Sequence, residues 1–108
     1  WQLALSQSAN KVALAQDLLQ MLVEFLPQVA VRVDAVARGE TDDDILALIH
    51  KLHGSCSYSG VPRLKQLCYY IEQQLRQGVG VETLEPEWFE LLDEIENVKR
   101  AAVAYLPR

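Results

Sequence analysis

The sequence has few of the residues that define several large classes of protein. Its 108 residues include 2 cysteines, 5 glycines and 4 prolines. So few cysteines exclude a disulfide-stapled scaffold, and so little glycine and proline excludes fibrous and disordered chains. Apolar runs are broken by Glu24, Pro27 and Arg32 before they reach the roughly 20 residues of a membrane-spanning helix. We therefore predict one globular domain over residues 1–108.

Positive charge is also scarce, because 10 Lys and Arg stand against 15 Asp and Glu, giving a formal charge of −5. A negative chain disfavours nucleic acid and anionic membranes as its main partners. We expect a protein partner, and a cytoplasmic location in which both thiols stay reduced. The first residue is Trp1 rather than Met, which suggests a segment of a longer protein.

Apolar residues recur at three- and four-residue spacing, the period of an α-helix, along most of the chain. This pattern predicts helices over 10–37, 41–58, 62–78 and 85–107, and residues 1–6 are expected to add a short lid helix. Amphipathic helices joined by short loops bury their apolar faces most economically as a bundle. The predicted fold is all-α: an antiparallel four-helix bundle with a short N-terminal lid helix.

Residues with special backbone preferences set the expected helix ends. Ser8 or Asn10 can cap the first helix, and Gly39 should end it. Pro27 lies inside this helix and should bend or split it, because proline removes a backbone donor. Thr41 is the expected N-cap of the second helix, followed by three acids in a first turn where the helix dipole favours negative charge: Asp42, Asp43 and Asp44.

On the second predicted helix, a rotation of about 100° per residue separates a core face from an outer face. With Ile45 as zero, the residues within about 60° of it form the core stripe: Leu48, Ile49, Leu52 and Cys56. His50 falls at about 140° and Gly54 at about 180°. Ala47 and Ser57 share this outer side, so the imidazole of His50 is expected to face solvent among small residues.

Gly54 and the histidines of this helix admit more than one interpretation. A glycine inside a helix costs about 1 kcal/mol relative to alanine, so either a neighbouring helix or a docking partner should need close approach at Gly54. His50, His53 and Cys56 recur every third residue, but their directions fan from about 140° to about 20°. A zinc site is therefore disfavoured, and Cys56 is predicted to pack in the core rather than to act as a nucleophile.

The string Ile-His-Lys-Leu-His-Gly-Ser-Cys at 49–56, followed by Gly60, Leu64, Leu67-Cys68 and Ile71-Glu72, closely resembles the signature of the histidine phosphotransfer (HPt) domain. In that family one helix carries His-x-Leu-Lys-Gly-Ser, and after a glycine turn the next helix reads Leu-x-x-Leu-Cys-x-x-Leu-Glu. The stretch 17–27 also looks like the family's long second helix. The resemblance therefore spans nearly the whole chain.

The resemblance implies a phosphorelay intermediate without kinase activity of its own. The histidine matching His50 would accept a phosphoryl group from a receiver-domain aspartate and pass it to another receiver, and the glycine matching Gly54 would leave room for docking. The implied partners are receivers of a parent hybrid sensor kinase and of a downstream response regulator. We expect no cofactor in this domain, Mg²⁺ on the receiver, no direct membrane contact and a monomer. The expected location is cytoplasmic, as the C-terminal part of an inner-membrane sensor kinase.

Roles for the surrounding residues follow from helix register and from the family pattern. Glu72 should lie at the height of His50 and accept a hydrogen bond from its Nδ1, although a solvated glutamate is the alternative. His53 stands where the family usually has lysine, and is expected near the phosphoryl group as a proximal or orienting residue. The residues expected to meet the docking receiver are Lys51, Gly54, Ser57, Arg63 and Lys65.

Two other functions remain open at this point. A helical adaptor that binds a partner helix would require apolar residues on an outer stripe, where the second helix instead has His, Gly, Ala and Ser. The dimerising part of a histidine kinase would also present a histidine on a bundle, but it works beside an ATP-binding domain, and the sequence has no nucleotide-binding glycine loop.

Overall fold

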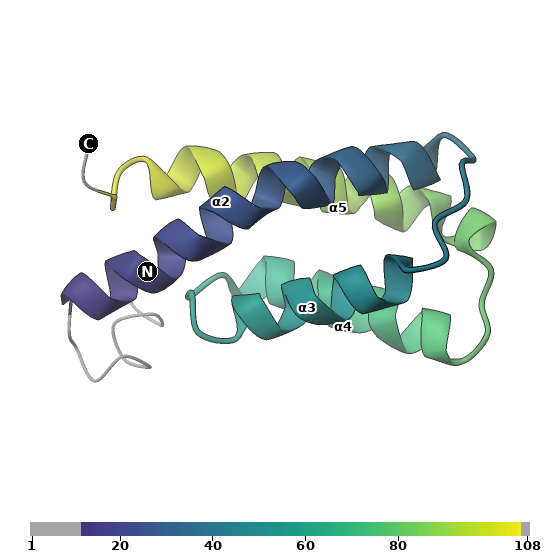
Figure 1. The fold of residues 1–108 in the computed structure, drawn as a ribbon, viewed down its shortest axis with the longest axis horizontal. Helices are drawn as coiled ribbons and strands as arrows, with labels where there is room; N and C mark the ends of the chain where they lie inside the picture. The colour runs from purple at the N-terminus through teal and green to yellow at the C-terminus, as the bar shows by residue number, and fades with distance from the viewer. Residues whose placement is uncertain (1–11, 107–108) are drawn as a thin grey trace.

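The computed structural model describes residues 12–106. In this part of the chain it has no strand and consists of helices: α2 (Val12–Ala37), α3 (Ile45–Cys56), α4 (Pro62–Arg76), the short 3-10 helix η1 (Val81–Leu84) and α5 (Glu85–Ala102). Successive α-helices run in opposite directions along the long axis, with α2 beside α5 and α3 beside α4 (Figure 1). The predicted antiparallel four-helix bundle is confirmed, while the expected lid helix and its neighbouring caps Ser8 and Asn10 lie outside the described residues.

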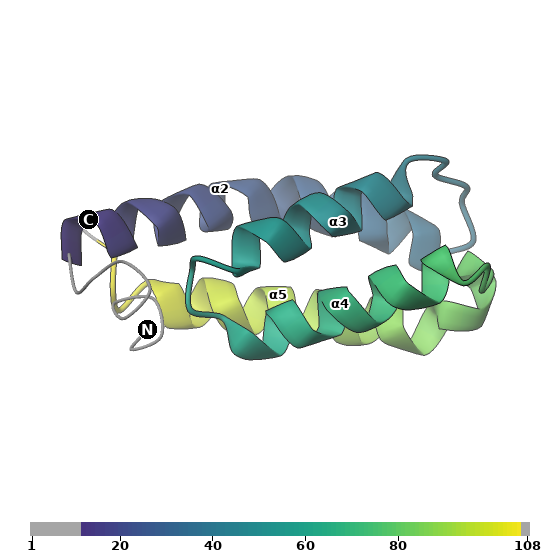
Figure 2. The same cartoon turned by 90° about the horizontal axis from the view of Figure 1, so that it is seen from below.

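The four helices enclose one apolar core, and the view from below shows them all aligned with the long axis (Figure 2). Trp88 of α5 is fully buried, and its indole Nε1 donates a hydrogen bond of 2.8 Å to the carbonyl of Val81 in η1. The sequence did not predict η1. The largest fully buried side chains come from all four α-helices: Trp88, Leu22, Leu26, Ile49, Leu52, Leu64, Ile71, Leu91 and Ile95.

Helix α2 continues without interruption through Pro27, so of the two predicted effects of this proline, bending or splitting the helix, splitting is wrong. Pro27 is exposed, whereas Leu26 and Val29 on either side of it are buried in the core. The apolar contacts on both sides of the proline therefore hold the two halves in one helix, and the missing backbone donor lies on the solvent side.

Helix α3 begins at Ile45, not at Thr41, so the expected cap and the acidic first turn are wrong. Asp42 instead accepts two hydrogen bonds from Arg32 of α2, at 2.8 Å each, and one from the backbone N–H of Asp44 at 3.1 Å. A bidentate Arg–carboxylate pair is stronger than a solvated cap, so it holds this segment as a loop. The helix ends at Cys56 rather than Tyr58, α4 ends at Arg76, and α5 ends at Ala102.

Replacing Pro27 by alanine should raise the free energy of unfolding by about 1–3 kcal/mol, because alanine restores a backbone donor and has a far better helix propensity. Urea denaturation followed by circular dichroism measures this change. Gln28→Ala, at an exposed neighbouring position, is the control and should change stability by less than about 0.5 kcal/mol. A Pro27→Ala protein no more stable than the wild type would contradict this account of α2.

Candidate functional site

His50 projects from the middle of α3 into solvent, as the helical arrangement predicts. Its side chain is 65% exposed, while Ile49 and Leu52 of the same helix are fully buried. Ala47 and Gly54, its small neighbours on the outer face, are exposed as well. The core residues of α3 therefore fix the rotation of the helix, and this rotation presents the imidazole on a rigid element.

Glu72 of α4 holds one nitrogen of this imidazole. Its Oε2 lies 2.7 Å from Nδ1 of His50, as helix register predicts for two antiparallel neighbours. The Glu72 side chain is only 6% exposed, so the alternative of a solvated glutamate is wrong. A buried carboxylate between α3 and α4 needs donors, and His50 is one of them.

Arg76, one turn further along α4, is a residue of this candidate site that the sequence analysis did not predict. Its Nε and Nη2 donate to the same Oε2 of Glu72, at 3.0 and 2.8 Å. The spacing of four residues between Glu72 and Arg76 is the spacing at which helical side chains pair, so this signal was present in the sequence. It gains importance only because the carboxylate is buried.

The charge of Glu72 determines which nitrogen of His50 is free to react. Burial raises the pKa of Glu72, but hydrogen bonds from Arg76 and His50 outweigh burial and hold that pKa below its usual range. Glu72 is therefore an anion at neutral pH and can only accept, so Nδ1 of His50 carries the proton that it donates. Nε2 then has the free lone pair, and it has no hydrogen-bond partner among residues 12–106.

His53 lies beside the Glu72 carboxylate rather than fully in solvent next to His50. Its side chain is 23% exposed, and its Nδ1 lies 3.3 Å from Oε1 of Glu72. The ring packs against Tyr69 of α4, with 5.6 Å between the ring centroids. The structure thus brings His53 together with His50 and Glu72, but through the carboxylate.

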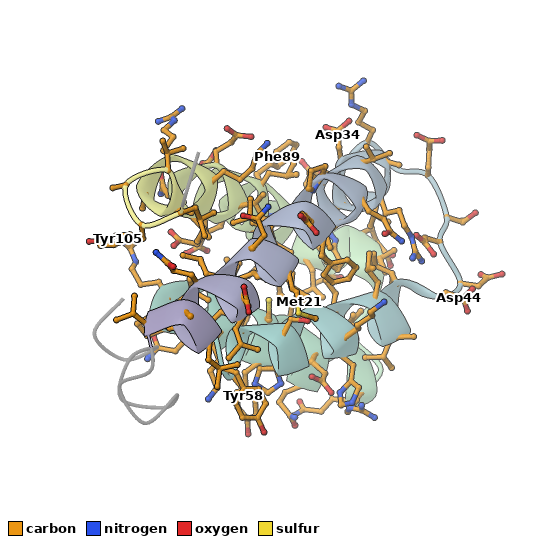
Figure 3. The ribbon with its side chains drawn as sticks, turned by 60° about the vertical axis from the view of Figure 1, so that its left-hand side comes forward. Met21, Asp34, Asp44, Tyr58, Phe89 and Tyr105 are labelled. Atoms are coloured by element: carbon orange, nitrogen blue, oxygen red, sulfur yellow. The ribbon has the colours of Figure 1, made fainter. Side chains whose placement is uncertain are left out.

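Gly54 is open to solvent. A Cβ atom placed on it would meet no heavy atom within 4 Å among the described residues. Packing of another described helix on Gly54, one of the two explanations for this glycine, is therefore wrong. The residue borders a groove of about 520 Å³ between α2 and α3. The groove is lined by Leu18, Met21, Leu22, Phe25, Lys51, Gly54, Ser55, Tyr58 and Ser59, of which Met21 and Tyr58 are labelled in Figure 3.

The remaining residues predicted for docking lie in different places. The ammonium of Lys51 sits 4.8 Å from the ring centroid of Phe25 in the groove, and the Ser57 hydroxyl donates to the carbonyl of His53 at 3.3 Å. Lys65 is half-buried and lies seven residues, or about two turns, before Glu72, hence on the same face of α4. Arg63 instead lines pockets between α4 and α5, away from His50.

Three other features are absent from the residues that the structure describes: a metal site, a membrane-spanning helix and a reactive cysteine. No cluster of three or more His, Cys, Asp or Glu within residues 12–106 could hold a metal ion, and no described helix is long and apolar enough to cross a membrane. Cys56 and Cys68 are free and buried. The contact with Cys56 and burial raise the pKa of the Cys68 thiol, which keeps it protonated and unreactive.

Comparison with known proteins identifies the family. The family model described as the Hpt domain matches residues 17–101. The chain belongs to the Hpt domain family. It is also similar to the HPt domain of a sensor hybrid histidine kinase from Shewanella, known from a crystal structure, with a TM-score of 0.91 and 39% sequence identity over 96% of this chain and 89% of that one.

Curated relatives of this HPt domain are much longer histidine kinases. The sequence as a whole predicts a likeness to the C-terminal HPt domain of BarA, and this likeness is confirmed: the chain is 60% identical over 102 residues to the signal transduction histidine-protein kinase BarA of Escherichia coli K12, covering 94% of this chain and 11% of BarA. The sensor histidine kinase GacS of Pseudomonas protegens is 30% identical over 83% of this chain and 9% of GacS. The chain thus spans about a tenth of these relatives.

Substituting Glu72 by glutamine should change how stability depends on pH. Because the native pKa of Glu72 is lowered, its ionisation stabilises the fold fully above the unfolded value of about 4.3, and this contribution is lost as pH falls through the native pKa. The melting temperature of the wild type should therefore drop more steeply below about pH 4.3 than that of Glu72→Gln.

Glu96→Gln is the matched control, since Glu96 is an exposed carboxylate whose one ion pair among residues 12–106 is with Lys99 at 3.4 Å. Its pH profile should follow that of the wild type. Identical profiles for Glu72→Gln and wild type would show that Glu72 is not held as an anion by its neighbours.

Proposed function

We propose that this HPt domain is a phosphorelay intermediate, which accepts a phosphoryl group on Nε2 of His50 from a receiver-domain aspartate and passes it to the aspartate of a second receiver. The observation that carries the proposal is the 2.7 Å contact between Nδ1 of His50 and Glu72 on a ring that is 65% exposed. This contact leaves the opposite nitrogen accessible with its lone pair free.

The transfer balances without any further reactant. The lone pair of Nε2 forms a bond to the phosphorus of the aspartyl phosphate, and the P–O bond to the aspartate breaks, with its electron pair leaving on the carboxylate oxygen. The imidazole becomes cationic while Nδ1 keeps its proton. Glu72, held as an anion by Arg76 and His50, stabilises this positive charge across 2.7 Å. The reverse reaction delivers the group to the second aspartate.

The receiver would supply the rest of the chemistry. Phosphoryl transfer depends on positioning and on neutralisation of the phosphoryl oxygens, and Mg²⁺ bound by the receiver can neutralise them. On this proposal the HPt domain contributes an oriented nucleophile and requires no cofactor or kinase activity of its own.

The groove between α2 and α3 is the proposed docking surface for the receiver. It adjoins the open backbone at Gly54 and includes exposed apolar side chains, Met21 and Tyr58, which a partner would bury on docking. Lys51 at the groove, Ser57 directly after α3 and Lys65 on α4 would contact the rim of the receiver. Arg63 lies toward α5, and its part in docking stays a prediction.

The setting of the relay follows from the relatives. BarA and GacS are named as a signal transduction histidine kinase and a sensor histidine kinase. We therefore propose that the domain works as a monomeric cytoplasmic module of an inner-membrane hybrid sensor kinase. Its partners would be the receiver of that kinase and the receiver of a downstream response regulator, with no direct contact to nucleic acid or membrane.

Incubation with a receiver domain phosphorylated on aspartate should label the wild type with acid-labile phosphate, and His50→Gln should abolish the label. The glutamine amide can still donate an N–H to Glu72 from this exposed position, so the helical content and melting temperature of His50→Gln should change little. Acid-labile phosphate that persists in His50→Gln would refute the assignment of the nucleophile. A wild type that takes no label from any receiver would favour the adaptor function.

Gly54 separates docking from folding. Gly54→Ala should keep or raise stability, by up to about 1 kcal/mol, because a Cβ meets no described atom within 4 Å. Gly54→Gln should slow transfer from the receiver by roughly 10-fold or more without unfolding the bundle, since misplaced reacting groups lose rate steeply.

The control is Ala101→Gln, the same side chain at an exposed position of α5, which should transfer at the wild-type rate. A Gly54→Ala protein destabilised by several kcal/mol would mean that the glycine serves the fold. A Gly54→Gln protein with unchanged kinetics would place docking elsewhere.

A further inference from the structure

The two oxygens of the Glu72 carboxylate differ in the number of hydrogen bonds that they accept. Oε2 accepts from Nδ1 of His50 and from both Nε and Nη2 of Arg76. Oε1 is buried and has no aligned hydrogen-bond partner among the described residues. A buried carboxylate oxygen without a donor is costly, so the atoms around Oε1 require an explanation.

His53 is the residue placed to serve Oε1. Its Nδ1 lies 3.3 Å from this oxygen, within ion-pair distance although short of an aligned hydrogen bond. The ring is confined, because it is only 23% exposed and packs against Tyr69. A small rotation of the ring or of the carboxylate aligns the N–H with Oε1, whereas a swing into solvent would give up the contact with Tyr69.

We propose that His53 is a positioning residue, whose Nδ1–H holds Oε1 of Glu72 and thereby keeps Oε2 directed at Nδ1 of His50. This inference rests on the proposed function, since it assigns His53 a part in preparing the nucleophile. It also replaces the expectation that His53 meets the phosphoryl group directly.

The need for a second anchor follows from the geometry of the carboxylate. The last torsion of a glutamate side chain is broad and weakly restrained, and the Arg76 side chain, 48% exposed, contacts Oε2 alone. If only Oε2 is held, the plane of the carboxylate can rotate, and the lone pairs of Oε2 then no longer point at Nδ1 of His50. A donor at Oε1 fixes the plane, so the direction of Oε2 and the tautomer of His50 are fixed together.

The test compares two substitutions that differ in one donor. His53→Asn keeps an N–H donor close to the place of Nδ1, and His53→Leu keeps an apolar side chain against Tyr69 but offers no donor. In the 108-residue chain, two-dimensional ¹⁵N NMR of the imidazole rings reports the fraction of His50 that carries its proton on Nδ1. We expect this fraction to stay high in the wild type and in His53→Asn and to fall in His53→Leu.

Transfer from a phosphorylated receiver gives the second readout. Phosphoryl transfer to His53→Leu should be slower by about 10-fold, which is the scale of the loss when a residue that orients a functional side chain is removed. Transfer to His53→Asn should stay within about twofold of the wild-type rate. If both variants keep the wild-type tautomer and rate, His53 is a bystander. If both lose them equally, the donor kept in His53→Asn is not what matters, and the proposal is likewise wrong.

Folding and function are controlled separately. Urea denaturation establishes that each variant is folded, and His53→Ala replaces His53→Leu as the donor-free variant if the leucine does not fit. The tautomer measurement needs no receiver. A wild type that accepts no phosphate would therefore refute the proposed function, while the NMR comparison would still decide whether His53 positions Glu72.

Discussion

A carboxylate enclosed between two helices stays ionised only when protein donors replace the water it has lost. Glu72 meets this condition through His50 on the neighbouring helix and Arg76 on its own, and the result is a lowered pKa in spite of burial. The anion then fixes the proton on Nδ1 of His50 and the free lone pair on Nε2. Under the proposed function, it also provides a site for the positive charge that would appear when the ring reacts. Without the ionised carboxylate, His50 would be an ordinary exposed histidine.

The bundle can be understood as the frame for this one contact. The apolar stripes of α3 and α4 set the rotation of each helix, and their antiparallel packing sets the height at which His50 and Glu72 meet. At the far end of α3, the pair formed by Arg32 and Asp42 anchors the incoming loop to α2. The position of the imidazole is thus determined by core packing and by fixed helix ends. The exposed outer face of α3 is not needed to hold the bundle together.

Helix periodicity was enough to predict the bundle, the core position of Cys56, the exposure of His50 and the contact with Glu72, because each depends on spacing along one helix or on the register of two. What it could not provide depends on competition between partners in space. Thr41 has the residue type of an N-cap, which predicts Asp42 in the first turn of the helix. Instead, Arg32, ten residues earlier in the sequence, donates hydrogen bonds to Asp42 and holds it in a loop. Likewise, residue type alone could not show that His53 turns toward a buried oxygen.

The open backbone at Gly54 and the exposed imidazole of His50 belong to one face of one helix. Under the proposed function, donor and acceptor receivers would have to use that same face, so they would compete for it and could never occupy it together. The relay would then follow ping-pong kinetics, with release of the first receiver before the second arrives. Its throughput would depend on how abundant each receiver is and how quickly each dissociates, and an excess of either unphosphorylated receiver would act as an inhibitor of the other.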